Sequence, residues 1–211
     1  MRSFDPSLYL VTDRELSLGR DLEFIVAEAI AGGVTMVQLR EKDCATGQFI
    51  ELARRLLAIT RPARIPLVIN DRVDVALAVD ADGVHVGQQD MPAEIARRLI
   101  GPEKILGISV ESVADAQAAG DLDIDYLGVS PVYLTATKPD ATRALGLEGL
   151  RAIRKISRHP LVAIGGMNQE TAPDTIAAGA DGIAVVSAIC SAPDPRSAAA
   201  SLKVDILKVK T

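Results

Sequence analysis

Eight short apolar segments recur along the chain, and longer segments with helical periodicity lie between them. Several of the short segments are rich in Val, Ile and Leu at both odd and even positions, which is typical of parallel strands covered on both faces. We therefore expect strands at 8–13, 35–41, 66–71, 83–87, 105–110, 125–132, 160–166 and 182–189.

The intervening segments have the spacing of amphipathic helices. Apolar residues within 22–30, 49–57 and 147–153 recur every three or four positions, so each segment has one apolar stripe. Gly32-Gly33 follows the first of these segments, where the end of a helix is expected.

Eight strand–helix units in 211 residues leave about 26 residues for each unit, which allows one strand, one helix and short loops. This spacing favours a closed (β/α)₈ TIM barrel of the α/β class over an open doubly wound sheet. No linker, charge block or low-complexity segment interrupts the pattern, so we expect residues 1–211 to form a single catalytic domain.

Composition narrows the class of protein further. The chain is 48% hydrophobic and 24% charged, which excludes disorder and a coiled coil, and its net charge of −5 argues against nucleic acid or an anionic membrane as the main partner. Cys44 and Cys190 have no CxxC spacing and are interpreted as packing residues in a reducing compartment. We expect a cytoplasmic protein with no membrane-spanning segment, and the sequence leaves open a homo-oligomer.

Polar residues at the carboxyl ends of the strands are the first candidates for an active site, because TIM barrels carry their sites at that end. On the second strand Gln38, Arg40 and Lys42 alternate with Val37 and Leu39. Because successive side chains of a strand point to opposite faces, the three polar side chains should point toward the barrel mouth and the two apolar ones toward the helices. Two cations and an amide at one mouth indicate an anionic ligand; an internal ion pair with a barrel carboxylate is the alternative.

Two aspartates follow neighbouring strands. Asp71 ends the third strand and Asp90 follows the fourth, and adjacent strands are about 4.8 Å apart. Two carboxylates that face one cation, with room for water and phosphate oxygens, are typical of a Mg²⁺ site. The alternative is that each aspartate caps the next helix.

The loop after the sixth strand carries two hydroxyls and a cation within four residues. Thr135, Thr137 and Lys138 suit the oxygens of a phosphate, although an ordinary polar surface loop would look similar.

The last two strands end in a second group that suits a phosphate. The seventh strand ends in Gly165 and Gly166, and the eighth carries Val186 and Ser187. The loops after these strands form the recurrent phosphate site of TIM barrels, where glycine lets the backbone approach the anion. Simple turn glycines are the alternative.

Other kinds of catalytic site have no signal in this sequence. We find no nucleophile elbow, GxGxxG after a strand, Walker A loop or metal-binding histidine cluster, and His85 on an apolar strand is more typical of a packed core residue. One anion site with a metal suits a diphosphate, and the other suits a monophosphate. Two small phosphorylated ligands at one mouth indicate a transfer reaction that releases pyrophosphate, without naming the substrates.

Six segments in this order resemble the thiamine-phosphate synthase family, and together they cover nearly the whole chain. They are QLREK (38–42), ND (70–71), DGVHVGQQD (82–90), TATK (135–138), AIGGM (163–167) and VVSAI (185–189). The family joins hydroxymethylpyrimidine diphosphate to a thiazole phosphate and releases pyrophosphate. The chain departs from the family pattern at Ser130, where glycine is usual, and at Leu134, where proline is frequent.

The resemblance implies a role for each matching position. It implies that Asp71 and Asp90 hold one Mg²⁺ ion, and that Arg40, Lys42 and Lys138 are catalytic because they neutralise the departing pyrophosphate. The substrate-binding residues that it implies are Gln38, Leu39, Arg40, Glu41, Lys42, Asn70, Ser109, Thr135, Ala136, Thr137, Lys138, Gly165, Gly166, Val186 and Ser187.

Two other functions would use a similar barrel. A thiazole tautomerase would need an acid–base residue at the mouth but no diphosphate–metal site, so the paired aspartates and the TATK loop favour the synthase. A non-catalytic sensor of a phosphorylated ligand would bind without turnover. The thiazole nitrogen has a lone pair and no proton, so the synthase reaction needs no general base, and dissociative loss of pyrophosphate from the aminopyrimidine is chemically reasonable.

Overall fold

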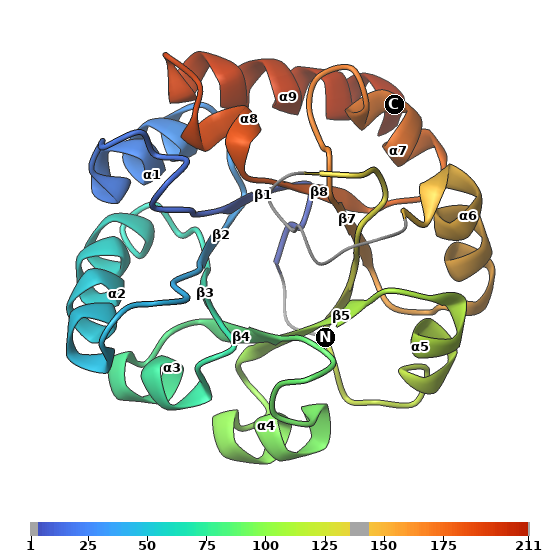
Figure 1. Ribbon diagram of the computed structural model, residues 1–211, viewed down its shortest axis with the longest axis horizontal. Helices are drawn as coiled ribbons and strands as arrows, with labels where there is room; N and C mark the ends of the chain where they lie inside the picture. The colour runs from blue at the N-terminus through green and yellow to red at the C-terminus, as the bar shows by residue number, and fades with distance from the viewer. Residues whose placement is uncertain (1–3, 136–143, 211) are drawn as a thin grey trace.

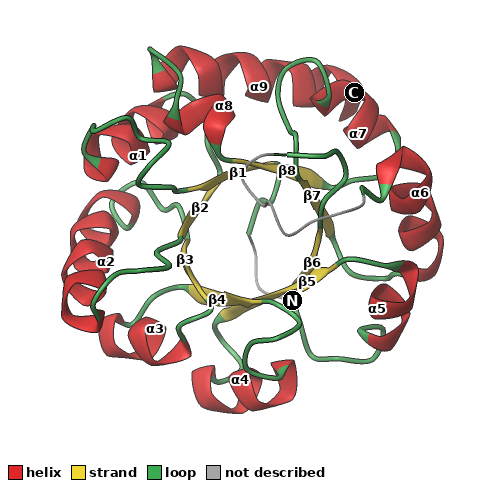
Figure 2. Cartoon of the chain, in the orientation of Figure 1, coloured by secondary structure: helices red, strands yellow, loops and turns green. Residues whose placement is uncertain are grey.

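The computed structural model describes residues 4–135 and 144–210, and its strands close into one parallel barrel in the order β1-β2-β3-β4-β5-β6-β7-β8. The helices form a ring around the barrel (Figures 1 and 2), which confirms the predicted TIM barrel. None of the helices in the described ranges is both long and apolar enough to cross a bilayer.

Seven of the eight strands are shorter than the apolar segments that predict them, and the fifth has the predicted bounds, 105–110. They are β1 Leu8–Val11, β2 Met36–Leu39, β3 Leu67–Asn70, β4 Gly83–Val86, β5 Ile105–Val110, β6 Tyr126–Val129, β7 Leu161–Ile164 and β8 Gly182–Val185. The helices are α1 Leu22–Ala31, α2 Thr46–Thr60, α3 Val73–Val79, α4 Ala93–Ile100, α5 Val113–Ala118, α6 Gly146–Ile156, α7 Ala172–Ala177, α8 Ser187–Cys190 and α9 Pro195–Lys210.

A polar residue directly before each even-numbered strand binds the backbone of the preceding strand. The hydrogen bonds run from Leu8 N to Thr35 Oγ1 (3.0 Å), Leu67 N to Asp82 Oδ2 (2.8 Å), Leu106 N to Asp125 Oδ2 (2.8 Å) and Leu161 N to Asp181 Oδ2 (2.7 Å). Each bond continues the register of its strand pair by one position toward the amino-terminal end. These four side chains therefore hold the register of the barrel at that end.

The side chains of the strands form two separate cores. Val37 and Leu39 of β2 belong to the large core between barrel and helices, whereas Gln38 points inward and binds Tyr9. The side chains of the small core inside the barrel are Tyr9, Val11, Met36, Val68, Ile105, Tyr126, Val162 and Ala184. The predicted alternation on the second strand is therefore confirmed.

The predicted eighth strand, 182–189, is wrong at its carboxyl end. β8 stops at Val185, and residues 187–190 form the short helix α8, in which Cys190 N donates to Val186 O at 2.8 Å. The Arg20 guanidinium donates to the carbonyl of Cys190 at 2.5 Å and to that of Ala192 at 2.7 Å. These long-range bonds stabilise a helical turn that the β-rich sequence VVSAI does not predict.

Asp125 provides a test of the amino-terminal end of the barrel. Its carboxylate accepts from Leu106 N and also from Arg97 Nη2 at 2.7 Å, and the two charged side chains are only 7% and 9% exposed. We predict that Asp125→Asn lowers the free energy of unfolding by about 3–5 kcal/mol, because Arg97 would lose its buried counter-charge and keep only the exposed Asp123.

The matched control is Asp123→Asn. Asp123 contacts the same guanidinium at 3.4 Å but is 75% exposed, so the control should cost less than about 1 kcal/mol. Urea unfolding of both variants measures the difference, and equal losses would contradict the importance of the buried pair.

Candidate active site

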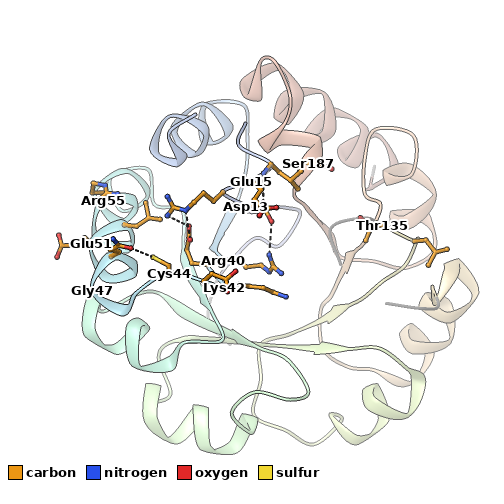
Figure 3. A pocket seen from close by; sticks show the side chains of 17 residues that line it. Asp13, Glu15, Arg40, Lys42, Cys44, Gly47, Glu51, Arg55, Thr135 and Ser187 are labelled. Atoms are coloured by element: carbon orange, nitrogen blue, oxygen red, sulfur yellow. Dashed lines mark hydrogen bonds and ion pairs between the residues drawn. The ribbon is translucent and has the colours of Figure 1, made fainter. Parts of the chain in front are cut away.

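Two adjoining hollows open at the carboxyl ends of the strands. The mouth cavity has a volume of about 420 Å³ and lies over the barrel, and the outer cleft of about 1290 Å³ extends toward α2 (Figure 3). Arg40, Lys42, Thr135 and Ser187 line both. The predicted site residues that line the mouth cavity alone are Gln38, Asn70, Asp71, Asp90, Ser109, Gly165, Gly166 and Val186.

The remaining predicted site residues are placed differently. Leu39 is fully buried against the helices, so only its backbone is available to a ligand. Glu41 lines the outer cleft, and Ala136, Thr137 and Lys138 lie outside the described residues.

The end of β2 brings cations to both hollows. Arg40 N donates to Thr12 Oγ1 at 3.1 Å, and its guanidinium pairs with Asp13 at 3.4 Å (Figure 3). Lys42 forms no ion pair with any residue in the described ranges. Asp13 was not among the sequence candidates, although it is the last residue of the first predicted strand.

Glu41 is turned away from this positive charge. Its carboxylate accepts from Arg14 Nε at 3.2 Å and from Arg14 Nη2 at 3.0 Å, a two-point contact. The pair neutralises a carboxylate that would otherwise repel an anion bound next to Arg40 and Lys42.

Asp71 and Asp90 lie against each other at the tops of β3 and β4. Burial, and then the adjacent Asp90 carboxylate, raise the pKa of Asp71 to about 6 from an ordinary value of 3.8, and Arg40 acts in the opposite direction. Neither aspartate caps a helix, because Arg72 precedes α3 and Pro92 precedes α4. The pair therefore concentrates negative charge where no helix end uses it.

The backbone around this carboxylate pair is constrained. Asp71 has a φ of 61°, which is uncommon outside glycine, and its N–H donates to His85 O at 2.8 Å. Asp90 Oδ2 accepts from Gly87 N at 2.7 Å, and a Cβ on Gly87 would lie only 2.9 Å from that oxygen. These contacts hold both carboxylates at the mouth.

The carboxylate pair suits a divalent cation that keeps much of its coordination for water and phosphate. Within the described ranges no cluster of three or more His, Cys, Asp or Glu side chains could hold a metal ion. Mg²⁺ is usually held by one or two carboxylates together with substrate phosphates, whereas structural zinc requires a fuller set of protein ligands.

The opposite side of the mouth has a backbone surface without side chains. Gly165 and Gly166 have φ angles of 99° and 68°. A Cβ at Gly165 would lie 2.8 Å from Pro131 Cβ, and one at Gly166 would lie 2.8 Å from Tyr133 Cβ. Both positions require glycine for conformation and for space, so a ligand at this edge meets backbone groups.

Val186 and Ser187 complete this edge at the start of α8. Ser187 is exposed in both hollows, and α8 is held in place by the bonds from Arg20 to its carboxyl end. Sequence reasoning missed Arg20, because nothing in the spacing of a residue between β1 and α1 indicates contact with residues 190–192.

The floor of the mouth cavity is polar, although it is built from the inner core. Tyr9, His85 and Tyr126 line it. His85 is 8% exposed, as a packed residue would be, but its Nδ1 lies 2.9 Å from Tyr126 Oη and its Nε2 lies 2.9 Å from Ser109 Oγ. The two tyrosines were not among the sequence candidates.

Comparison with known proteins agrees with this geometry. The chain is 56% identical to the thiamine-phosphate synthase of Chloroflexus aurantiacus and 53% identical to that of Albidiferax ferrireducens, over 94% and 93% of this chain and 92% and 90% of those proteins. It superimposes with a TM-score of 0.90 on the structure of thiamine phosphate pyrophosphorylase from Pyrococcus furiosus, at 42% identity over 98% of both chains.

A sequence model of the family described as thiamine monophosphate synthase (TMP-TENI) matches residues 8–189, which include every strand and the site built on them. The chain belongs to the thiamine monophosphate synthase family and is a transferase.

Proposed function

We propose that this chain joins hydroxymethylpyrimidine diphosphate to a thiazole phosphate, giving thiamine phosphate and pyrophosphate. The observation that supports this most strongly is that two groups of residues, each suited to an anion, line one mouth. The cations at the end of β2 lie next to a carboxylate pair, which suits a diphosphate with a metal, and the glycine edge suits a monophosphate.

Each group of residues has a separate part in the proposed reaction. Arg40 and Lys42 bind the diphosphate and stabilise the charge that grows on it as its bond to the pyrimidine methylene breaks. Gly165, Gly166 and Ser187 hold the thiazole phosphate, so that the ring nitrogen points at that carbon. The nitrogen attacks with its own lone pair, and no residue has to remove a proton from it.

Asp71 and Asp90 are the residues that would hold Mg²⁺. When bound, this ion supplies positive charge to the leaving pyrophosphate. The raised pKa of Asp71 supports the assignment, because burial and the adjacent Asp90 carboxylate outweigh the effect of Arg40 in the protein alone. Lys138 and Thr137, which lie outside the described residues, are proposed to contact the phosphates from the loop after β6.

An end-point assay tests the proposed reaction. We predict that purified protein with Mg²⁺, pyrimidine diphosphate and thiazole phosphate forms thiamine phosphate, detected as fluorescent thiochrome phosphate after oxidation, and that EDTA abolishes the product. If the folded protein forms none, the proposal fails. Turnover of thiazole carboxylate phosphate tautomers would then identify a tautomerase, and tight binding of thiamine phosphate without turnover would identify a sensor.

Lys42 tests the stabilisation of the leaving group. We predict that Lys42→Ala lowers kcat about 100-fold and changes KM for the thiazole phosphate by less than threefold, because the lost charge interacts mainly with the departing diphosphate. Lys155→Ala, which removes an exposed side chain of α6, is the matched control and should have wild-type kinetics. Loss of thiazole phosphate binding with unchanged kcat would contradict this role.

Asp71 tests the link between charge and stability. Its folded pKa of about 6 lies above the ordinary 3.8, so its ionisation opposes folding as the pH rises from about 4 to 6, and the penalty is complete above pH 6. We predict that Asp71→Asn raises the free energy of unfolding at pH 8 by about 1 kcal/mol, since the nominal 3 kcal/mol is reduced by partial solvent exposure. The same variant should lose synthase activity.

Urea unfolding at pH 4 and pH 8, without divalent ions, measures this effect. The gain should vanish at pH 4, and the exposed control Asp43→Asn should show no gain at either pH. A gain of equal size at both pH values would show instead that asparagine is simply better suited to the left-handed backbone at this position.

A further inference from the structure

A chain of hydrogen bonds crosses the floor of the mouth cavity from β2 to β5. Gln38 Nε2 donates to Tyr9 Oη at 2.9 Å, and Tyr9 Oη lies 3.0 Å from Tyr126 Oη. His85 joins Tyr126 to Ser109, with 2.9 Å on each side of its ring. Both ends of the chain, Gln38 and Ser109, line the cavity.

The barrel provides space for this chain at two glycines. A Cβ on Gly107 would overlap the Tyr126 ring, and a Cβ on Gly128 would lie 3.0 Å from His85 Cε1. Tyr126 also contacts Phe4 and Tyr9, with ring centroids 6.0 and 5.9 Å away. The two phenols and the imidazole are therefore packed in one position.

The direction of each bond follows from counting protons. Tyr9 is fully enclosed and already accepts from Gln38, so among the described residues its single proton has only Tyr126 Oη as an acceptor. Burial raises the pKa of both phenols well above the ordinary value, so both keep their protons. An enclosed hydroxyl without an acceptor is costly, which makes this arrangement the favoured one.

The same count of protons extends along the hydrogen bonds from Tyr126 to Ser109. The Tyr126 proton goes to His85 Nδ1, so the imidazole is neutral and carries its proton on Nε2. That Nε2–H donates to Ser109 Oγ, which leaves the Ser109 proton for a group in the cavity. At the first end, the amide N–H groups of Gln38 face the hydroxyls of both tyrosines, and its Oε1 is left for a ligand.

We propose that Tyr9, Tyr126 and His85 are positioning residues that fix the direction of hydrogen bonding in the site, so that Ser109 meets the substrate ring as a donor and Gln38 meets it with its amide edge in one orientation. This inference rests on the proposed function, because it takes the ring to be the aminopyrimidine. The amino group of this ring donates a hydrogen bond, which Gln38 Oε1 can accept. An oxo-pyrimidine offers the reverse pattern and is rejected.

The tautomer of His85 can be measured directly in the free protein. The chain has two histidines, so a long-range ¹H–¹⁵N spectrum of ¹⁵N-histidine-labelled protein contains two ring systems, and His159 is the internal reference. We expect His85 to be neutral with its proton on Nε2. Tyr126→Phe removes the hydroxyl that donates to Nδ1, so the ¹⁵N shift of Nδ1 should move toward that of a nitrogen that accepts no hydrogen bond. A wild-type Nδ1–H tautomer would overturn the proposed direction.

Ring recognition is measured with the amino and oxo forms of hydroxymethylpyrimidine monophosphate, which lack the diphosphate leaving group. In the presence of Mg²⁺ the wild-type protein should bind the amino form at least about 100-fold more tightly. This preference should fall about tenfold in Tyr126→Phe and remain unchanged in Tyr133→Phe, a control that removes the hydroxyl of the third tyrosine in the chain. A purely structural role of Tyr126 would weaken both ligands equally and leave the ratio intact.

The two measurements separate the possible failures. An unchanged ratio in Tyr126→Phe, with the variant folded, would overturn the positioning role. If His85 carries its proton on Nε2 but the protein binds neither pyrimidine, the proposed substrate and the proposed ring recognition are both overturned. The direction of the hydrogen bonds would still stand.

Discussion

The register of the parallel barrel is the constraint on which the rest of this structure depends. Parallel strands are joined only through helical crossovers, so no tight hairpin sets their alignment. Thr35, Asp82, Asp125 and Asp181 supply the alignment instead, since the side chain of each forms a hydrogen bond with the backbone of the neighbouring strand. A slip of one residue on β2 would turn Gln38 outward and bring Leu39 into the barrel. The polar mouth therefore exists because the opposite end of the barrel is aligned.

Much of the fold could be predicted from local pattern, because the strands and helices differ in period. Alternation on β2 was enough to separate Val37 and Leu39 from Gln38, and strand ends pointed to Asp71 and Asp90 as neighbours. Residues whose role comes only from long-range contacts could not be found this way. Nothing near Arg20 indicates that it holds α8, and a strand pattern continues through Ser187 until those contacts replace it with a helix.

The tyrosines in the floor of the site could not be predicted from the sequence either, for a different reason. Tyr9 and Tyr126 lie on strands β1 and β6, far apart in sequence, and each looks like an ordinary aromatic core residue. Their hydroxyls become informative only when the closed barrel places them 3.0 Å apart beside His85. Apolar periodicity identifies which face is buried, but it does not show that a buried face is joined by hydrogen bonds.

Stability and function are supplied by opposite ends of the same strands. At the amino-terminal end Asp125 is matched by Arg97 and by a backbone N–H, so its burial stabilises the barrel. At the mouth Asp71 is held in a left-handed backbone conformation, with a raised pKa and a second carboxylate beside it. The raised pKa means that ionisation of Asp71 opposes folding in the protein without a bound cation. The fold gives up this free energy at the mouth, and the proposed role of Asp71 in holding a cation beside a diphosphate accounts for that cost.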